Sequence, residues 1–307
     1  MKKQVKIIMV VLCICALVGT IAIGLAGCKK DAEKDITVIS REDGSGTRDA
    51  FDSLIKKDGA SLVKDANGKK YTTSPFVKSI EMLSKTGDVK TKVSSTKTAI
   101  GYISLGSLDN TVKALTINGV VASSENVLNG TYLLKRPFVI VTSNSTTLTA
   151  ATDDFVKYLK SSQAQIIVKG QKYVEQASTT AYTAPATAVS GTIYIKGSTS
   201  VDPLMDKLIA DYQKIGGAKV SGIEFEKDAQ GSSHGITAAK EDTTGNVIGM
   251  SSSAIKTADA GSLSQFNIAL DAVAVIVHKD NGIQNVTIEQ LFDIYTGAIT
   301  KFSQITA

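Results

Sequence analysis

Residues 36–51, ITVISREDGSGTRDAF, contain the pattern that decides the fold: an apolar strand runs directly into a glycine-rich turn and then into a helix. The run ITVIS is short, β-branched and almost continuously apolar, which is typical of a strand buried on both faces. The GSGT turn that follows can present backbone N–H groups at the start of the helix. Unpaired amides and the positive end of the helix dipole favour an anion at such a place.

Similar glycine-, serine- and threonine-rich turns follow three later strand patterns. They are KGSTSVDPLM from Lys196, QGSSHGITAAK from Gln230 and GMSSSAIK from Gly249. The first two also run straight into helical patterns. One such turn is weak evidence for a ligand, but four that converge would form a cage of neutral donors around a small oxyanion.

Strand and helix patterns alternate along the whole chain, which predicts an α/β fold. The other strand patterns are AIGYISL from Ala99, FVIVT from Phe138, TIYIKG from Thr192, VSGIEFE from Val220, NVIGMS from Asn246 and AVAVIVH from Ala272. The predicted helix N-caps are Asp202, followed by Pro203; Thr287, in a capping box with Gln290; and Thr152. Glycines are expected to end the first two of these helices, at Gly216 and Gly297. Residues 177–191, ASTTAYTAPATAVSG, lack apolar periodicity and indicate a linker.

The N-terminus has the features of an export signal. Three lysines precede an apolar run that ends at LAGC, so we interpret residues 1–27 as a lipoprotein signal peptide, with lipid attached to Cys28 and a tether over residues 28–35. An uncleaved membrane-spanning helix is the alternative. Both interpretations place the rest of the chain outside the cytoplasm, at the outer face of the cytoplasmic membrane.

Composition excludes several classes of function. The chain has 307 residues and a net charge of +5, and removal of the three lysines of the signal leaves 5 − 3 = +2, which is too little to indicate nucleic-acid binding. Cys28 is the only cysteine after the signal, so no disulfide framework is expected. Because only two histidines are present, we also expect no metal site and no cofactor.

Arg41 is the charged residue most directly attached to an anion-binding turn. Its guanidinium can bind two oxyanion oxygens at once, and Asp43 could hold it in place. An Arg-Glu-Asp cluster of this kind is more often a solvated surface ion pair. The GSGT turn immediately after it favours the functional interpretation.

Taken together, the motifs resemble those of a known family, the phosphate-binding proteins of ABC phosphate importers (PstS). The resemblance rests on ISREDGSGTRDAF, KGSTSVDPLMDKL, QGSSHGI and IGMSSSAIK, with weaker matches in AIGYISLGSL, NGTYLLKRPFVIVT and IEQLFDIYTGAITKF. It implies a two-lobed periplasmic-binding-protein fold of type II with the ligand cleft between the lobes. It also implies an extracytoplasmic lipoprotein that captures inorganic phosphate for an ABC permease, expected to act as a monomer. The ligand residues implied by motif are Arg41, Ser45, Gly46, Thr47, Thr199, Ser200 and Ser232.

The order of the motifs differs from the family's usual order, in which the GSTS and GSSxG turns come first. The sequence therefore resembles a circularly permuted member, joined at about residues 177–191. In that case residues 36–135 and 280–307 form the lobe with the REDGSGT loop. Residues 136–279 form the second lobe.

A second difference concerns the choice of anion. At neutral pH phosphate keeps a proton and sulfate does not, so a buried acceptor favours phosphate. Well-known members have an aspartate where this chain has Ser252, and a hydroxyl accepts a hydrogen bond but does not repel sulfate as a carboxylate does. Phosphate is the expected ligand, with sulfate, tungstate and molybdate as alternatives.

Two other functions are compatible with parts of the sequence. Residues 231–235, GSSHG, fit the G-x-S-x-G pattern of a serine hydrolase with Ser233 as nucleophile, and Asp271 and His278 follow in the right order. Those two would lie on one strand, seven residues apart, on opposite faces. An anion-sensing or adhesion protein on the same fold is the other alternative. The lysine-rich stretch KSIEMLSKTGDVKTK, from Lys78, is interpreted as a solvated face.

Overall fold

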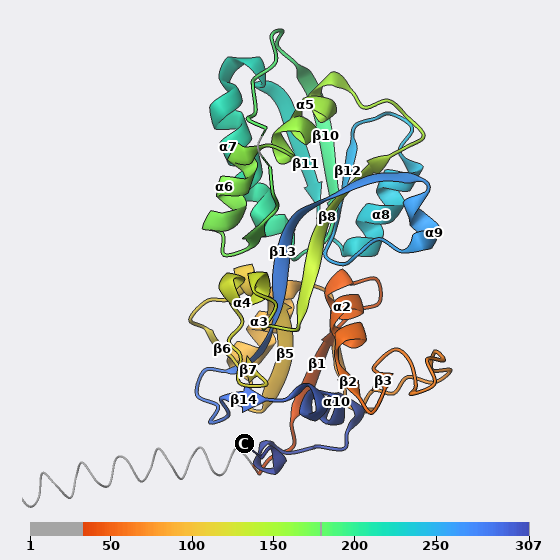
Figure 1. The fold of residues 1–307 in the computed structure, drawn as a ribbon, viewed down its shortest axis with the longest axis vertical. Helices are drawn as coiled ribbons and strands as arrows, with labels where there is room; N and C mark the ends of the chain where they lie inside the picture. Colours follow the sequence, from red (N-terminus) through yellow and green to blue (C-terminus); the bar gives the residue numbers. More distant parts are fainter. Residues whose placement is uncertain (1–32, 179, 307) are drawn as a thin grey trace, which may run out of the picture.

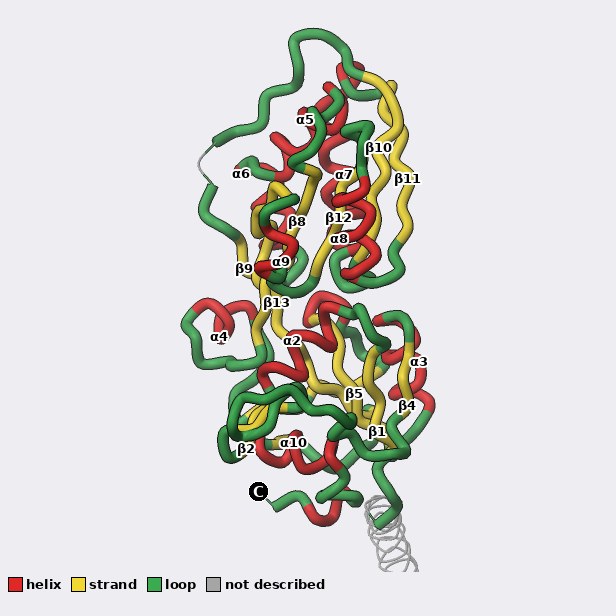
Figure 2. The backbone as a smooth tube through the Cα atoms, turned by 90° about the vertical axis from the view of Figure 1, so that its right-hand side faces the viewer, coloured by secondary structure: helices red, strands yellow, loops and turns green. Residues whose placement is uncertain are grey.

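Two lobes stand one above the other, joined by two long strands that cross between them (Figure 1). The structure is a computed structural model and describes residues 33–178 and 180–306. The crossing strands are β8 (Lys135–Ser143) and β13 (Leu263–His278), which pair antiparallel. Figure 2 shows from the side that the two lobes lie on either side of this connection. The mixed α/β, two-lobed architecture agrees with the predicted fold class.

The first lobe is the lower one in Figure 1. Its strands are β1 (Thr37–Arg41), β2 (Lys56–Lys57), β3 (Ala60–Ser61), β4 (Glu81–Leu83), β5 (Ala99–Ser104), β6 (Val112–Ala114), β7 (Thr116–Ile117) and β14 (Asn285–Val286). Its helices are α2 (Gly46–Leu54), α3 (Thr86–Ser95), α4 (Ser124–Leu128) and α10 (Ile288–Thr296), with 3-10 turns η1 (Leu105–Ser107) and η3 (Phe302–Gln304). Strand β1 pairs in parallel with β4 and β5, and β5 pairs antiparallel with β13.

The second lobe has helices on both faces of its sheet. Its strands are β9 (Val174–Glu175), β10 (Ser190–Gly197), β11 (Gly222–Asp228) and β12 (Val247–Ser251). Its helices are α5 (Ala150–Leu159), α6 (Ser162–Gly170), α7 (Asp202–Gly216), α8 (Ser232–Glu241) and α9 (Thr257–Ala260), with 3-10 turn η2 (Gly217–Lys219). Strand β10 pairs in parallel with β11 and β12, and β12 pairs antiparallel with β8. Among the described residues the strand order is therefore β11-β10-β12-β8-β13-β5-β1-β4, continuous through both lobes.

All seven predicted strands are present. The last one is longer than predicted, because β13 begins nine residues before Ala272 in order to cross between lobes. Each lobe has its own hydrophobic core. Strand β13 contributes Ile268 and Ala269 to the second core but residues 272–275 and Val277 to the first. The boundary between the lobes thus falls inside β13, whereas the sequence suggested that the second lobe continues to residue 279.

The helix ends are partly as predicted. Thr287 and Gln290 form the capping box at the start of α10, and Gly297 ends the helix in the left-handed conformation, with φ 85°. The predictions of Asp202 and Thr152 as N-caps were wrong. Helix α7 starts at Asp202 itself, whose carboxylate binds Lys227 Nζ at 2.7 Å. The cap of α5 is Thr149, three residues before the predicted one.

The segment 177–191 is attached to the second lobe more firmly than a linker needs to be. The Tyr182 hydroxyl donates to Asp154 Oδ2 at 2.7 Å, and its ring packs edge-on against Tyr158. At the other end of the molecule the two ends of the described chain lie side by side, because Ile36 N donates to Thr300 O at 2.7 Å. Adjacent ends are the condition that circular permutation requires. The permutation itself stays a prediction.

Asp52 on α2 is a buried carboxyl group with an incomplete set of partners. Its Oδ2 accepts from Arg48 Nε at 3.2 Å, but Oδ1 is buried without a hydrogen bond. Burial raises the pKa of Asp52 to about 7 despite the neighbouring Arg48. The folded state therefore keeps a proton that the unfolded state has already lost, and the stability this gives is full below about pH 4 and is lost as pH rises to about 7.

Asp52→Asn should remove the loss of stability that Asp52 causes as pH rises to about 7. The variant is expected to be more stable than the parent by about 1–2 kcal/mol at pH 8 and by much less at pH 5, because the amide never ionises. Chemical denaturation of both proteins at the two pH values measures the difference in their free energies of unfolding. The contributions of the other carboxyl groups are the same in both proteins and cancel from this difference. An equal difference at both pH values would show that Asp52 does not titrate between them.

Candidate functional site

The REDGSGT loop lies where β1 ends and α2 begins, facing the second lobe. Ser45 caps α2, with its hydroxyl accepting from Arg48 N at 3.4 Å. The next amide, Gly46 N, donates to Ser232 Oγ of the second lobe at 3.2 Å. Gly44 adopts φ 86°, which a glycine tolerates at no steric cost and which allows the chain to turn sharply into the helix. The positive end of α2 is thereby directed at the interface between the lobes.

Arg41 is buried at this interface, with 2% of its surface exposed. Its guanidinium forms a two-pronged ion pair with Glu42, at 2.8 Å from Nε to Oε2 and 2.9 Å from Nη2 to Oε1. Nη2 also donates to Thr199 Oγ1 of the second lobe at 3.1 Å. A fully buried, hydrogen-bonded guanidinium is unlike a solvated surface pair, so the surface interpretation does not hold.

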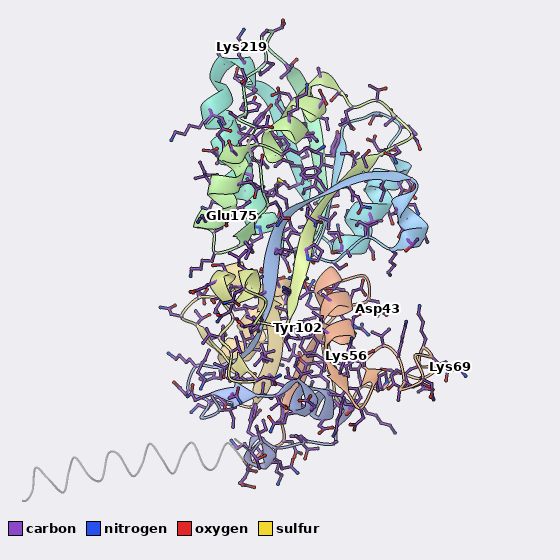
Figure 3. All side chains as sticks on the ribbon, viewed as in Figure 1. Asp43, Lys56, Lys69, Tyr102, Glu175 and Lys219 are labelled. Atoms are coloured by element: carbon purple, nitrogen blue, oxygen red, sulfur yellow. The ribbon has the colours of Figure 1, made fainter. Side chains whose placement is uncertain are left out.

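The predicted supporting role of Asp43 is wrong. Its carboxylate binds Arg48 Nη1 at 2.6 Å, and its side chain is 97% exposed. Figure 3 shows Asp43 at the outer edge of the first lobe. Glu42 holds Arg41 instead, because the sharp turn after Glu42 directs the next side chain to solvent.

Four predicted ligand hydroxyls form two pairs at the interface: the first joins the two lobes, and the second lies within the second lobe. Thr47 Oγ1 lies 2.9 Å from Ser200 Oγ, and Ser232 Oγ lies 3.3 Å from Ser252 Oγ. The backbone of the last turn is held as well, since Ser252 N donates to Ser232 Oγ at 3.0 Å. All four residues are at most 2% exposed. Thus the structure brings the predicted residues together from both lobes, in a form in which the lobes touch.

Thr86 is part of this cluster, although the sequence interpretation missed it. It is the first residue of α3, and its Oγ1 lies 3.2 Å from Arg41 Nη1, 3.0 Å from Ser200 Oγ and 3.2 Å from Thr199 Oγ1. The lysines around it instead favour a solvated face. A better signal was available: the short strand β4 ends just before Thr-Gly-Asp, the same strand-to-helix pattern as in the other turns.

Four helices therefore begin at one place, namely α2 and α3 from the first lobe and α7 and α8 from the second. The helix starts and the turns before them supply backbone N–H groups and hydroxyls. Arg41, the last residue of β1, adds one guanidinium. This set of donors suits a small oxyanion, which accepts hydrogen bonds on every side.

The hydrolase arrangement is absent. Asp271 Oδ2 accepts from Arg136 Nη2 at 3.0 Å and Oδ1 from Ser104 Oγ at 2.9 Å, while His278 Nδ1 accepts from Asp280 N at 3.1 Å. These groups are engaged with partners other than Ser233. Within residues 33–178 and 180–306, no group of three or more His, Cys, Asp or Glu side chains is arranged to hold a metal ion.

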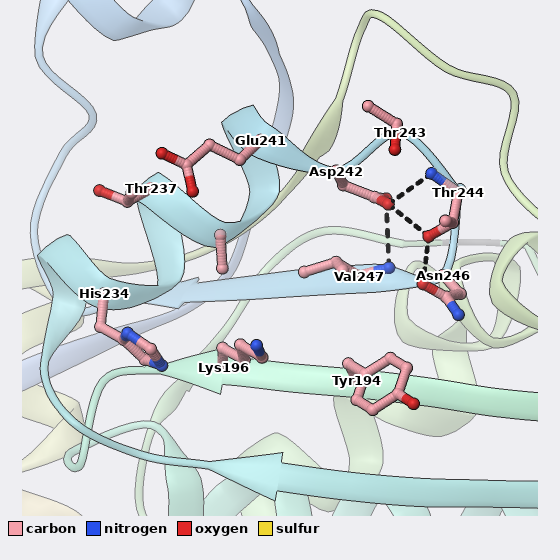
Figure 4. Close-up of a pocket in the computed structure, with 11 residues that line it drawn as sticks. Tyr194, Lys196, His234, Thr237, Glu241, Asp242, Thr243, Thr244, Asn246 and Val247 are labelled. Atoms are coloured by element: carbon pink, nitrogen blue, oxygen red, sulfur yellow. Dashed lines mark hydrogen bonds between the residues drawn. The ribbon is translucent and has the colours of Figure 1, made fainter.

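A separate depression lies on the second lobe between α8 and strands β10 and β12 (Figure 4). Its one deeply held carboxylate, Asp242, accepts from Thr244 N at 2.8 Å, Thr244 Oγ1 at 2.7 Å and Val247 N at 3.2 Å. That side chain shapes its own loop. None of the predicted ligand residues lines this depression.

The predicted signal peptide and Cys28 lie outside the described residues. Of the helices that the structure describes, none combines the length and the apolar character needed to cross a membrane.

Comparison with known proteins gives a consistent result. Residues 29–163 and 182–307 match the PBP superfamily domain. The chain is 38% identical over 301 residues to phosphate-binding protein PstS 2 of Streptococcus pneumoniae, covering 94% of this chain and 97% of the relative. It is 35% identical over 297 residues to phosphate-binding protein PstS 2 of Streptococcus agalactiae, covering 95% and 96%. A crystal structure of a phosphate-binding protein of a phosphate ABC transporter from Streptococcus pneumoniae matches with a TM-score of 0.66 and 40% identity, over 89% of this chain and all of the other.

Proposed function

The chain belongs to the PBP superfamily and, within it, to the PstS phosphate-binding proteins, and from this we propose that it captures inorganic phosphate outside the cytoplasm for an ABC importer. Its relatives are binding proteins of a transporter rather than enzymes, as the sequence interpretation expected. The observation that carries the proposal is the convergence of four helix starts and the Arg41 guanidinium on one buried spot between the lobes.

In the proposed mechanism the anion binds between the lobes and is enclosed when they close. Arg41, with the Ser45, Gly46 and Thr47 turn, binds it from the first lobe. The hydroxyls and amides of Thr199, Ser200, Ser232 and Ser252 bind it from the second. We add Thr86 to this set, because its hydroxyl already contacts both Arg41 and Ser200.

Fixed donors of this kind replace the hydration shell of the anion without a metal. Glu42 neutralises Arg41, so much of the attraction comes from oriented N–H and O–H dipoles that need little reorganisation when the anion arrives. The closed form would then be the one that the permease recognises.

We further propose that the protein is exported by residues 1–27 and anchored through a lipid on Cys28, with the lobes beyond the tether. The apolar run followed by LAGC supports this proposal. Intact-mass measurement of the membrane-bound protein tests it: a lipid mass that disappears in Cys28→Ser supports the anchor, and an unmodified or uncleaved chain overturns it.

Calorimetry on the soluble form that starts after Cys28 tests the function itself. Phosphate, sulfate and tungstate are titrated in turn, and tight binding is expected for phosphate. Binding of none of the three would overturn the proposal in favour of a sensing or adhesive protein on the same fold. Preferred binding of another anion would keep the capture mechanism but change the substrate.

Ser252→Asp is expected to raise the preference for phosphate over sulfate by about tenfold or more, because a carboxylate accepts the phosphate proton and repels sulfate. Calorimetric titration of both anions measures the ratio. Ser253→Asp is the matched control, since it adds the same charge one residue further along the turn. An unchanged ratio in Ser252→Asp would show that the acceptor for the phosphate proton lies elsewhere.

A further inference from the structure

A buried ion pair lies in the connection between the lobes. Arg136 on β8 and Asp271 on β13 are direct partners in the antiparallel register of the crossing strands. Nε and Nη2 of Arg136 donate to Asp271 Oδ2 at 3.1 Å and 3.0 Å. The two side chains are 1% and 0% exposed. The pair therefore lies at the hinge, away from solvent.

Each member of the pair is also bound to one of the lobes. Nη1 of Arg136 donates to the backbone carbonyl of Ser252 at 3.1 Å, in the ligand turn of the second lobe. Oδ1 of Asp271 accepts from Ser104 Oγ at 2.9 Å and from Leu105 N at 3.2 Å, where β5 of the first lobe ends. One ion pair thus links the end of a first-lobe strand to the Ser252 turn.

Stability alone does not account for this pair. Removing two charges from water is costly, and well-packed apolar residues of the same size are often as stable or more stable. The cost is visible here, because burial raises the pKa of Asp271 to about 6 even though Arg136 lies beside it. An ion pair that is costly to bury and that has partners on both sides of the hinge is suited to holding those partners in a fixed relative position.

Arg136 also borders the predicted anion site, because it donates a hydrogen bond to the carbonyl of Ser252. Burial lowers the pKa of Arg136, and the positive charge of Arg41 lowers it further, whereas Asp271 opposes both effects. The two positive charges therefore oppose each other. Because each guanidinium is paired with a carboxylate, Glu42 or Asp271, the main link of Arg136 to the site is its hydrogen bond to the Ser252 carbonyl.

We propose that Arg136 is a positioning residue for the anion site, which holds the Ser252 turn in its binding geometry and uses Asp271 to tie that geometry to the first lobe. This inference rests on the proposed phosphate binding and adds a residue that does not touch the ligand. Loss of the Arg136 guanidinium would free the Ser252 carbonyl and leave Asp271 without its counter-ion. The turn would then meet the anion in a less defined arrangement.

Arg136→Met tests the proposal. The dissociation constant for phosphate, measured by calorimetry well below the melting temperature, is expected to rise about 10- to 100-fold, as when a buried charge pair that fixes an interface is broken. Arg136→Lys keeps the charge and should recover part of the affinity. Asp154→Asn is the matched control, since Asp154 is buried in the second lobe and binds the hydroxyls of Tyr182 and Tyr212. It is expected to lower the melting temperature but leave the affinity within about threefold of the parent.

The outcomes separate this inference from the proposed function. If the parent protein does not bind phosphate, the function fails first. If the parent binds phosphate and Arg136→Met is folded and binds it equally well, the positioning role is wrong while the function stands. If Arg136→Met does not fold, Asp271→Asn and Ser104→Ala take its place, because both keep the shape of the hinge. Unchanged affinity in both of these would overturn the proposal.

Discussion

Arg41→Ala is expected to weaken phosphate binding by at least about 2 kcal/mol, roughly a thirtyfold rise in the dissociation constant. The guanidinium is the one cationic side chain among the proposed ligands, and it is buried with its donors directed at both lobes. The substitution removes the pair of charged donors. It also leaves Glu42 without its partner, and this carboxylate would then repel the anion.

Arg41→Lys separates the charge from the geometry. It keeps the positive charge but cannot bind two oxygens in one plane while also holding Glu42, so about half of the lost binding free energy should return. Calorimetry on all three proteins measures the series, and thermal denaturation checks that each is folded. An unchanged affinity in a folded Arg41→Ala variant would refute the assigned role.

The contrast between Arg41 and its neighbours indicates what local sequence can predict. Strand, glycine turn and helix start are encoded within a dozen residues, so the loop and the position of its arginine could be predicted before the fold was known. Whether Glu42 or Asp43 is the partner of Arg41 could not be predicted in this way. It depends on the direction in which each side chain leaves the turn, and the residue that we predicted lies in solvent.

Thr86 and Arg136 were missed for different reasons. Thr86 follows a strand of only three residues, and the lysines around it are typical of an exposed helix. Arg136 acts through partners at positions 252 and 271, more than 100 residues away in sequence. Their proximity arises from the pairing of β8 with β13 and with β12, which no local pattern indicates. The same limitation explains why Asp271 was considered only as part of a hydrolase triad.

Gly46 offers the second large effect, because its Cα faces the Ser232 and Ser252 turns of the other lobe. A methyl group added at its Cα would stand 2.4 Å from Ser232 Oγ, 2.9 Å from Ser252 Oγ and 3.0 Å from the Ser252 carbonyl carbon. A serine hydroxyl can rotate away, but the backbone of the Ser252 turn is held by Arg136. The clash therefore exists only when the lobes are closed, and it cannot be relieved by side chains alone.

Gly46→Ala should consequently act as a wedge between the lobes. The dissociation constant for phosphate is expected to rise about 10- to 100-fold, in line with the usual cost of overpacking a tight contact. The melting temperature without ligand should stay the same or rise slightly, because alanine favours the first turn of α2. Small-angle scattering is expected to show little compaction when phosphate is added to the variant.

Gly87→Ala is the matched control for this wedge. Gly87 is the second residue of α3, beside Thr86, and a methyl group added there meets nothing within 4 Å. It changes helix propensity in the same direction without entering the interface, so its affinity and its compaction with phosphate should match those of the parent. If Gly46→Ala also binds and compacts like the parent, the lobes need not approach as closely as in this structure. In that case the ligand would be held in a more open form, and the contacts between Thr47 and Ser200 and between Gly46 and Ser232 would not describe its binding geometry.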